Sequence, residues 1–131
     1  MKKPRILLAD DHRMVAEGLR GLLELDYDLV GIVEDGRALL EAADRLMPEV
    51  VVADVSMPLL NGIEAVRQLK KKNPDVPVVF LTMHMDVADA ASAFEAGAAG
   101  YVLKHSAPSE LLTAIKSALK GQTYITPLLA G

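Results

Sequence analysis

Five polar side chains have the types and positions that phosphoryl chemistry requires. Asp10 and Asp11 directly follow one apolar run of the chain, and Asp54 follows a second. Thr82 and Lys104 come directly after two further apolar runs. In an open parallel sheet, ligands bind beyond the carboxyl ends of the strands, where the strand order reverses. If the apolar runs are neighbouring strands, these five side chains lie together at one edge of the sheet.

The charges of this set predict that it binds a cation. Two like charges ~4 Å apart repel by about 4 kcal/mol at an effective dielectric of ~20. Three carboxylates beside one ammonium therefore either raise the pKa of a carboxyl group or attract a positive ion. Because the ligand atoms are oxygens, we expect a hard ion, Mg²⁺ or Mn²⁺. Thr82 and Lys104 add donors for phosphoryl oxygens, and an ionised Asp54 is a nucleophile that needs no activating base.

The elements that position these residues are predicted from five apolar runs that do not alternate with polar residues. Such runs are typical of strands buried on both faces of a parallel sheet. Between them, apolar residues recur with helical period. We therefore predict an α/β fold, a doubly wound, flavodoxin-like (βα)5 parallel sheet with strand order 2-1-3-4-5. The predicted strands are residues 5–9, 29–33, 50–53, 76–81 and 101–103.

Two segments stand apart from this regular pattern. Residues 86–96 are helical by composition, but their possible core side chains are mostly alanine, with Val87 and Phe94 as the exceptions. We expect this helix to be the least firmly packed, because alanine buries little apolar area. Residues 121–131 fit none of the strand–helix units and are interpreted as a tail or the start of a linker. The predicted domain is therefore residues 1–120.

Composition excludes several classes of protein. A chain of 131 residues is most economically one domain. Its 18 acidic and 14 basic residues give a formal net charge of −4, which argues against a nucleic-acid surface in this piece. It has no cysteine, hence no disulfide and no thiolate metal site. No apolar stretch approaches the ~18 residues of a membrane span, and the basic start is followed by too short an apolar run for export. We expect a cytoplasmic domain with no membrane contact.

The same residues, taken in order, resemble the receiver domain of response regulators in two-component signalling. The resemblance covers roughly residues 5–119. The segment from Asp10 to His12, followed by Glu17-Gly18-Leu19, is similar to the LuxR/NarL/FixJ-type transcription regulators, as is the start of a linker at Gly121 to Pro127. The full set is specific, whereas each piece alone is weak. The matching motifs are Ala9-Asp10-Asp11, Asp54 with Met57-Pro58 and Gly62, Leu81-Thr82, and Gly100-Tyr101-Val102-Leu103-Lys104.

The resemblance implies a metal site and an acceptor. Asp54 would be the phosphoacceptor, taking its phosphoryl group from a phosphohistidine of a sensor histidine kinase. Asp11, Asp54 and the backbone carbonyl of Ser56 would hold Mg²⁺ (or Mn²⁺), with Asp10 acting directly or through water. The protein would then be no enzyme in the usual sense, since it would catalyse only its own phosphotransfer and slow self-dephosphorylation.

The resemblance also implies a switch and its partners. Lys104 would bind the phosphoryl group, Thr82 would move to hydrogen-bond it, and Tyr101 would turn inward into the vacated space. Phosphorylation would favour a homodimer, through the first and fifth helices or through the fourth and fifth. DNA would be bound only through a helix-turn-helix output domain absent from this chain, for transcription regulation. Met83, bulkier than the usual residue after the switch threonine, is expected to narrow access to Asp54 and to change the phosphate lifetime.

Three other functions compete with this interpretation. A magnesium phosphatase with an aspartyl intermediate needs a second Asp two residues after its nucleophile, where this chain has Ser56. A flavin or nucleotide binder needs glycines and hydroxyls in the first loop, which here is acidic. A receiver-like docking module that is not phosphorylated stays as the alternative, although the complete acidic set argues against it. The three histidines lack metal-ligand spacing and are assigned to the solvated surface: His12, His84 and His105.

Overall fold

The computed structural model describes residues 3–84 and 86–126, and in them strands and helices alternate five times. A further short strand, β6, ends the described part of the chain. The strands are β1 (Arg5–Ala9), β2 (Asp28–Val33), β3 (Val50–Asp54), β4 (Val78–Thr82), β5 (Gly100–Leu103) and β6 (Tyr124–Ile125). The helices are α1 (Arg13–Leu23), α2 (Gly36–Leu46), α3 (Gly62–Lys72), α4 (Val87–Glu95) and α5 (Ala107–Leu119).

All strand pairs are parallel, and the sheet has the order β2-β1-β3-β4-β5-β6. The predicted order 2-1-3-4-5 is therefore confirmed, with β6 added at the outer edge of β5. The strand order reverses between β1 and β3, which are direct neighbours with Ala9 opposite Ala53. This register places the residues that follow β1 beside the end of β3.

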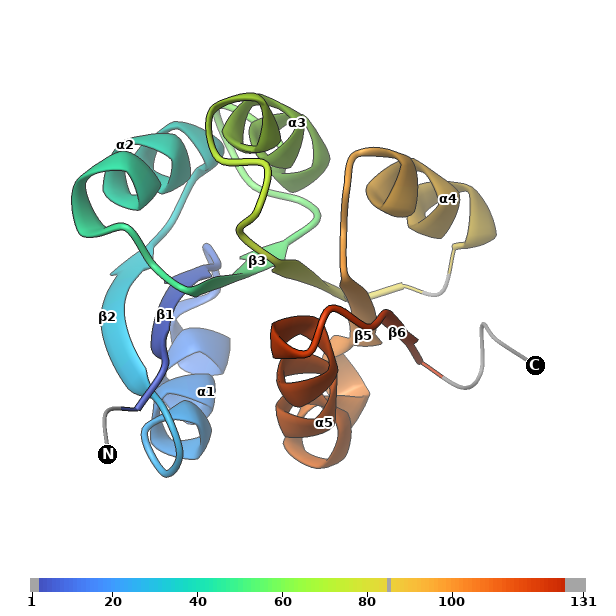
Figure 1. The fold of residues 1–131 in the computed structure, drawn as a ribbon. Helices are drawn as coiled ribbons and strands as arrows, with labels where there is room; N and C mark the ends of the chain where they lie inside the picture. Colours follow the sequence, from blue (N-terminus) through green and yellow to red (C-terminus); the bar gives the residue numbers. More distant parts are fainter. Residues whose placement is uncertain (1–2, 85, 127–131) are drawn as a thin grey trace.

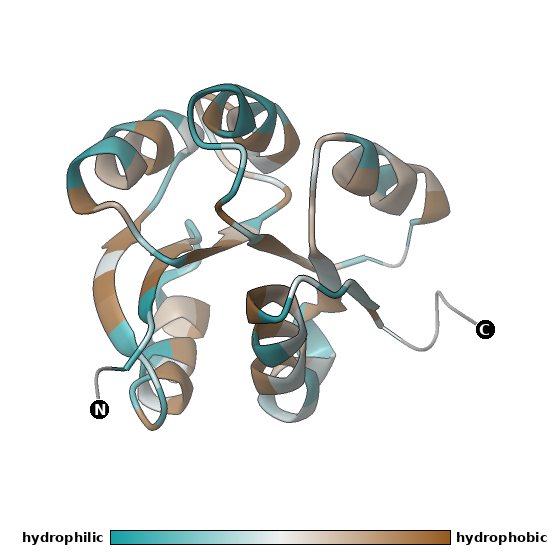
Figure 2. Cartoon of the chain, viewed as in Figure 1, coloured by the Kyte–Doolittle hydropathy of each residue, from teal (hydrophilic) through white to brown (hydrophobic). Residues whose placement is uncertain are grey.

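The sheet lies between two layers of helices, with α2, α3 and α4 on one face and α1 and α5 on the other (Figure 1). Side chains of β1, β3 and β4 alternate between two apolar clusters, one under each helix layer. In Figure 2 the central strands are mainly hydrophobic, whereas the helices carry hydrophilic residues on their outer sides. Burial on both faces accounts for the continuous apolar runs of the strands.

Helix starts on the site side of the sheet are set by short polar side chains. Asp35 accepts a hydrogen bond from the backbone N–H of Ala38 at 2.7 Å, and Asn61 accepts one from Glu64 at 2.9 Å. These caps satisfy backbone donors that the first helical turn leaves free. They fix where α2 and α3 begin. The start of α3 in turn sets the length of the loop between Asp54 and that helix.

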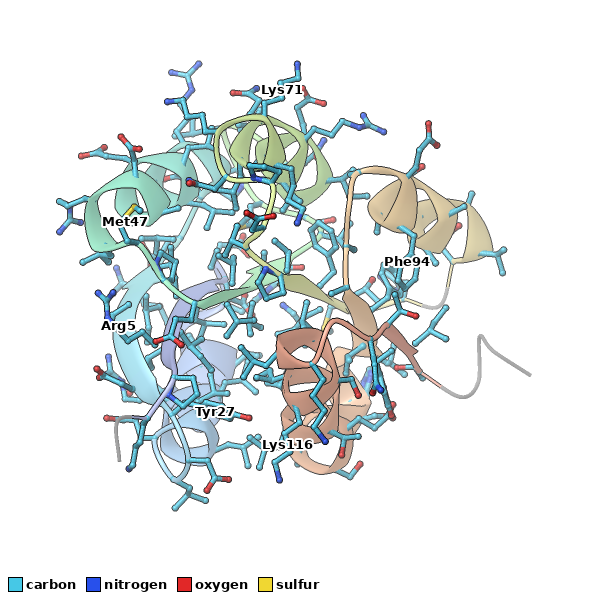
Figure 3. All side chains as sticks on the ribbon, viewed as in Figure 1. Arg5, Tyr27, Met47, Lys71, Phe94 and Lys116 are labelled. Atoms are coloured by element: carbon cyan, nitrogen blue, oxygen red, sulfur yellow. The ribbon has the colours of Figure 1, made fainter. Side chains whose placement is uncertain are left out.

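Helix α4 contributes little to the core. Its buried residues are Ala90 and Ala93, and Phe94 packs partly buried on the side that faces the sheet (Figure 3). The expectation that Val87 is a core side chain of this helix is wrong, because Val87 is 72% exposed. It is the first residue of the helix, and its side chain lies on the solvent side. The packing of α4 therefore depends on two alanines and one phenylalanine.

The chain after α5 returns to the sheet edge. The backbone N–H of Tyr124 donates to Ala99 at 2.9 Å, and that of Thr126 donates to Tyr101 at 3.0 Å. The predicted tail or linker at 121–131 thus begins with a strand that pairs with β5, and residues 127–131 lie outside the described part. Within residues 3–84 and 86–126, none of the helices combines the length and the apolarity needed to cross a bilayer.

Candidate functional site

The ends of β1, β3 and β5 bring three charged side chains into direct contact. Asp10 follows β1, Asp54 is the last residue of β3 and Lys104 follows β5. The Lys104 Nζ lies 2.9 Å from Asp54 Oδ2 and 3.0 Å from Asp10 Oδ2, and it donates to Asp10 Oδ1 at 3.2 Å. All three residues are buried. The sheet topology thus assembles an ion-pair network from residues that are far apart in the sequence.

Asp54 has a perturbed pKa with identifiable causes. Burial raises its pKa above the ordinary aspartate value, and the negative charge of Asp10 raises it further. The Lys104 ammonium and the Ser56 backbone N–H act in the opposite direction, because both stabilise the carboxylate. Ionised Asp54 at this site therefore depends on positive charge close to it.

A buried oxygen of Asp10 is left without a hydrogen bond. Asp10 is 1% exposed, and among the described residues its Oδ2 has no hydrogen-bond partner, although the Lys104 ammonium lies within ion-pair distance. A buried polar atom in this state is costly unless a further partner satisfies it. This oxygen therefore leaves an acceptor available inside the acidic cluster.

The loop after β3 holds the Asp54 carboxylate from the other side. The Ser56 backbone N–H donates to Asp54 Oδ1 at 3.2 Å, and the Gly62 N–H donates to the carbonyl of Val55 at 2.8 Å. A Cβ at Gly62 would lie 2.0 Å from the Asp54 carbonyl oxygen. Helix α3 can begin this close to the phosphoacceptor candidate only because residue 62 has no side chain.

The two switch candidates lie on neighbouring strands. The Thr82 hydroxyl donates to the carbonyl of His84 at 3.0 Å. Its hydrogen bond is therefore made to the β4–α4 loop and not to the acidic residues. The Tyr101 ring is 0% exposed, and its hydroxyl has no hydrogen-bond partner among the described residues. Burial raises the pKa of the Tyr101 phenol. The ring lies inward here, and its movement on phosphorylation stays a prediction.

The sequence interpretation missed one member of the cluster, His12. Its Nδ1 lies 3.1 Å from Asp10 Oδ1, 3.4 Å from Asp11 Oδ1 and 3.6 Å from Asp54 Oδ2. The predicted surface position of His12 is confirmed, since its side chain is 51% exposed, but the expectation that it lies apart from any metal-ligand set is wrong, because its ring is directed at the acids. Its position directly after Asp10 and Asp11 was the available signal. Spacing rules for metal sites do not find it, because Asp54 comes from another strand, β3.

Comparisons with known proteins decide the family. The model of the family described as response regulator receiver domain matches residues 6–116. This chain belongs to that family. The receiver domain is 35% identical over 127 residues to the transcriptional regulatory protein DegU of Brevibacillus brevis, a match that covers 95% of this chain and 54% of DegU.

Solved structures agree with this assignment. A LuxR-family two-component response regulator from Aurantimonas sp. SI85-9A1 superposes on the receiver domain with a TM-score of 0.94 at 38% identity, covering 98% of this chain and 94% of that one. The isolated receiver domain of RcsB from Salmonella enterica serovar Typhimurium, solved with the phosphomimetic BeF3⁻, gives 0.89 at 29% identity, covering 98% and 97%. The relatives are regulators of the LuxR/NarL/FixJ type, and the chain spans just over half the length of DegU.

The acidic pocket of this receiver domain has the composition of a divalent cation site. One ligand atom from each of four residues lies within 4.8 Å of the others: Asp10, Asp11, His12 and Asp54. Receiver domains typically bind Mg²⁺ at such a pocket, and carboxylate oxygens are the ligands this ion prefers. The buried Asp10 Oδ2, which contacts the Lys104 ammonium at 3.0 Å but has no hydrogen bond among the described residues, is a further acceptor that a cation could use. The residues present therefore fit a hard divalent ion.

Proposed function

We propose that this receiver domain accepts a phosphoryl group on Asp54 from a sensor histidine kinase and acts as a switch in a phosphorelay. The observation that carries the proposal is the buried Asp54 carboxylate, which lies 2.9 Å from the Lys104 ammonium at the reversal of strand order. An Asp54 oxygen attacks phosphorus, the P–N bond to the kinase histidine breaks, and the imidazole leaves with the bonding electron pair. The product is an acyl phosphate on Asp54.

Divalent cation binding is part of this proposal. Asp11, Asp54 and the Ser56 carbonyl would hold Mg²⁺ or Mn²⁺, with Asp10 acting directly or through water. Such an ion supplies positive charge that offsets the repulsion between a carboxylate nucleophile and phosphoryl oxygens. The buried Asp10 Oδ2, which has no hydrogen bond among the described residues, and the oxygen-rich donor set support this assignment.

Lys104 and Thr82 are the residues proposed to bind the phosphoryl group on Asp54. The Lys104 ammonium lies next to Asp54 Oδ2 and would bind a phosphoryl oxygen there through a charge-assisted hydrogen bond. Thr82 would give up its bond to the His84 carbonyl and donate to the phosphoryl group. Tyr101, buried under α4, would report this change to the α4–β5–α5 surface. Slow attack of water on the acyl phosphate would return free Asp54 and inorganic phosphate.

The partners follow from the same proposal. A sensor histidine kinase is the phosphoryl donor, and a homodimer forms on phosphorylation. DNA is bound through a helix-turn-helix domain of the whole protein that lies outside these 131 residues, which would make the switch a transcription regulator. The similarity to DegU, a transcriptional regulatory protein, supports this output. Sedimentation before and after phosphorylation tests the dimer.

Intact mass after incubation with acetyl phosphate and Mg²⁺ tests the proposal. We expect a gain of one phosphoryl group, about 80 Da. The gain should vanish in Asp54→Asn and persist in Asp75→Asn, a matched change at an exposed aspartate away from the site. No gain in the unaltered chain, with either the small donor or a cognate kinase, contradicts the proposal and favours a docking module that is not phosphorylated.

A further inference from the structure

The His12 ring lies inside the acidic cluster without serving the fold. His12 is the residue before α1, and its side chain makes no capping hydrogen bond to that helix. The local structure uses its backbone instead, since its N–H donates to Asp10 Oδ1 at 2.9 Å and its carbonyl accepts from Ala16. The imidazole is 51% exposed and contributes to neither apolar cluster. The direction of the His12 ring is therefore explained by a role in the acidic cluster.

The ring nitrogen and the carboxylates surround one positive centre. The Lys104 Nζ lies 3.0 Å from His12 Nδ1, 2.9 Å from Asp54 Oδ2 and 3.0 Å from Asp10 Oδ2. An ammonium has no acceptor, so the contact between Lys104 Nζ and His12 Nδ1 fits the tautomer whose proton is on Nε2, in which Nδ1 offers a lone pair. The same lone pair is available to a metal ion in the pocket. The nitrogen thus joins the carboxylate oxygens as a ligand atom directed at a cation.

A nitrogen ligand changes which ion such a pocket prefers. Mg²⁺ is a hard ion that takes oxygen ligands and keeps several waters. Later first-row transition ions such as Co²⁺ and Ni²⁺ bind imidazole and carboxylate together and more tightly than Mn²⁺, which like Mg²⁺ is suited by oxygen ligands. The buried Asp10 Oδ2 has no hydrogen-bond partner among the described residues besides its 3.0 Å ion-pair contact with the Lys104 ammonium, so it can accept a further ligand bond. A mixed site of three carboxylates and one imidazole suits Co²⁺ and Ni²⁺ better than Mg²⁺ or Mn²⁺.

We propose that His12 Nδ1 is a metal ligand and that it makes this receiver domain select a divalent transition ion that binds nitrogen, such as Co²⁺ or Ni²⁺, over Mg²⁺ and Mn²⁺. The proposal rests on the cation site of the proposed function and names its preferred class of ion. Asp11 and Asp54 bind either type of ion, whereas His12 contributes strongly only to the transition ion. The choice of ion is thereby set by the residue that follows the acidic pair.

Metal binding by the phosphate-free protein tests this selectivity without any activity assay. The probes are Mn²⁺, followed by the electron paramagnetic resonance of the free ion, Co²⁺, followed by its visible absorption, and Mg²⁺, measured by competition with Mn²⁺. A buffer of about pH 8 keeps an ordinary imidazole neutral and able to ligate. The variants are His12→Ala and His12→Gln, with His105→Gln as the matched control, because His105 is exposed and lies outside the cluster.

We expect both His12 variants to lower the affinity for Co²⁺ about tenfold or more and the affinities for Mn²⁺ and Mg²⁺, which prefer oxygen ligands, less than about twofold. The Co²⁺ spectrum should change in the same variants, since a nitrogen ligand is lost. His105→Gln should match the unaltered chain. Thermal unfolding without metal shows whether the variants keep their fold. If His12→Ala does not fold, His12→Gln, which retains a polar side chain, provides the comparison.

Asp11→Asn separates this proposal from the proposed function. If Asp11→Asn weakens binding of all three ions while the His12 variants bind like the unaltered chain, His12 is no ligand and only the selectivity proposal is overturned. An equal loss of Mg²⁺ and Co²⁺ affinity in the His12 variants also overturns it. If neither Asp11→Asn nor the His12 variants change binding, the cation site itself is in another place.

Discussion

At the scale of single residues, one ammonium compensates most of the buried negative charge of the site. Lys104 contacts both Asp10 and Asp54, and the Asp54 pKa is raised by burial even in its presence. Its contribution is therefore larger than that of a surface ion pair, because the two carboxylates are nearly inaccessible to water. A divalent cation at the same carboxylates would take over part of this role.

Lys104→Ala should lower the free energy of unfolding by about 3 kcal/mol at neutral pH, because the removal of one partner leaves buried charge uncompensated. Saturating Mg²⁺ should return part of that loss, since an ion that binds only the folded state stabilises it. Chemical denaturation with and without Mg²⁺ measures both effects. Lys71→Ala, at an exposed lysine of α3 (Figure 3), is the matched control and should change little. Equal stability of the two variants would contradict the prediction.

At the scale of elements, the β3–α3 connection depends on close contact between backbone segments. The Gly62 N–H bonds the carbonyl of Val55, and Asn61 caps α3 directly before it. The start of the helix therefore lies against the last residue of β3. Any side chain at position 62 has to displace the Asp54 backbone, and the Asp54 carboxylate moves with it.

Gly62→Ala should lower the free energy of unfolding by about 1 to 3 kcal/mol, because its Cβ overlaps the Asp54 carbonyl oxygen. It should also slow phosphorylation by acetyl phosphate. The matched change is Gly21→Ala on α1, where a Cβ meets nothing within 4 Å. That variant should gain up to about 1 kcal/mol, since alanine favours a helix over glycine. Urea denaturation of both variants measures the two changes in the free energy of unfolding. If both variants were stabilised, the close contact at Gly62 would not restrict the side chain at that position.

At the scale of the whole molecule, the sheet extends beyond the proposed domain boundary at residue 120. Strand β6 pairs with β5, and Thr126 Oγ1 accepts a hydrogen bond from the Leu103 N–H at 2.9 Å, next to Lys104. The Tyr124 hydroxyl donates to Glu110 Oε1 of α5 at 2.8 Å. The segment that would lead to an output domain is thus held against β5, the strand that carries Tyr101.

Tyr124→Phe should weaken this attachment and change how stability depends on pH. Burial and the nearby Glu110 carboxylate raise the pKa of Tyr124 to about 12. Between about pH 10 and that value, the phenol ionises in the unfolded chain but not in the folded one, so the unfolded state binds fewer protons. The stability that Tyr124 contributes is therefore complete below pH about 10 and is lost as the pH rises.

Urea denaturation at a series of alkaline pH values measures this effect. The unaltered chain should lose stability more steeply than Tyr124→Phe above pH about 10. At neutral pH the variant should be less stable by about 1 kcal/mol, the usual contribution of one hydrogen bond. Parallel curves for the two proteins would mean that the Tyr124 hydroxyl does not hold β6 to α5.

The sequence by itself determined the strands, the helices and the residues at the strand ends. Continuous apolar runs can be satisfied only by burial on both faces, and Asp10, Asp54, Thr82 and Lys104 each directly follow or end such a run. Once the strand order is predicted, the convergence of these residues follows from the parallel direction of the strands. These features depend on local pattern and on general rules of topology, so they could be predicted without coordinates.

Only the tertiary structure decided where individual side chains point. The ring of His12 turns into the acidic cluster, Val87 turns out to solvent, and Tyr124 finds its partner on α5. Each outcome depends on other elements of the fold. The direction of the His12 ring depends on the Asp54 carboxylate at the end of β3 and on the Lys104 ammonium after β5. The exposure of Val87 depends on how α4 is oriented on the sheet. Such contacts join residues that are distant in the sequence, and no pattern of neighbouring residues records them.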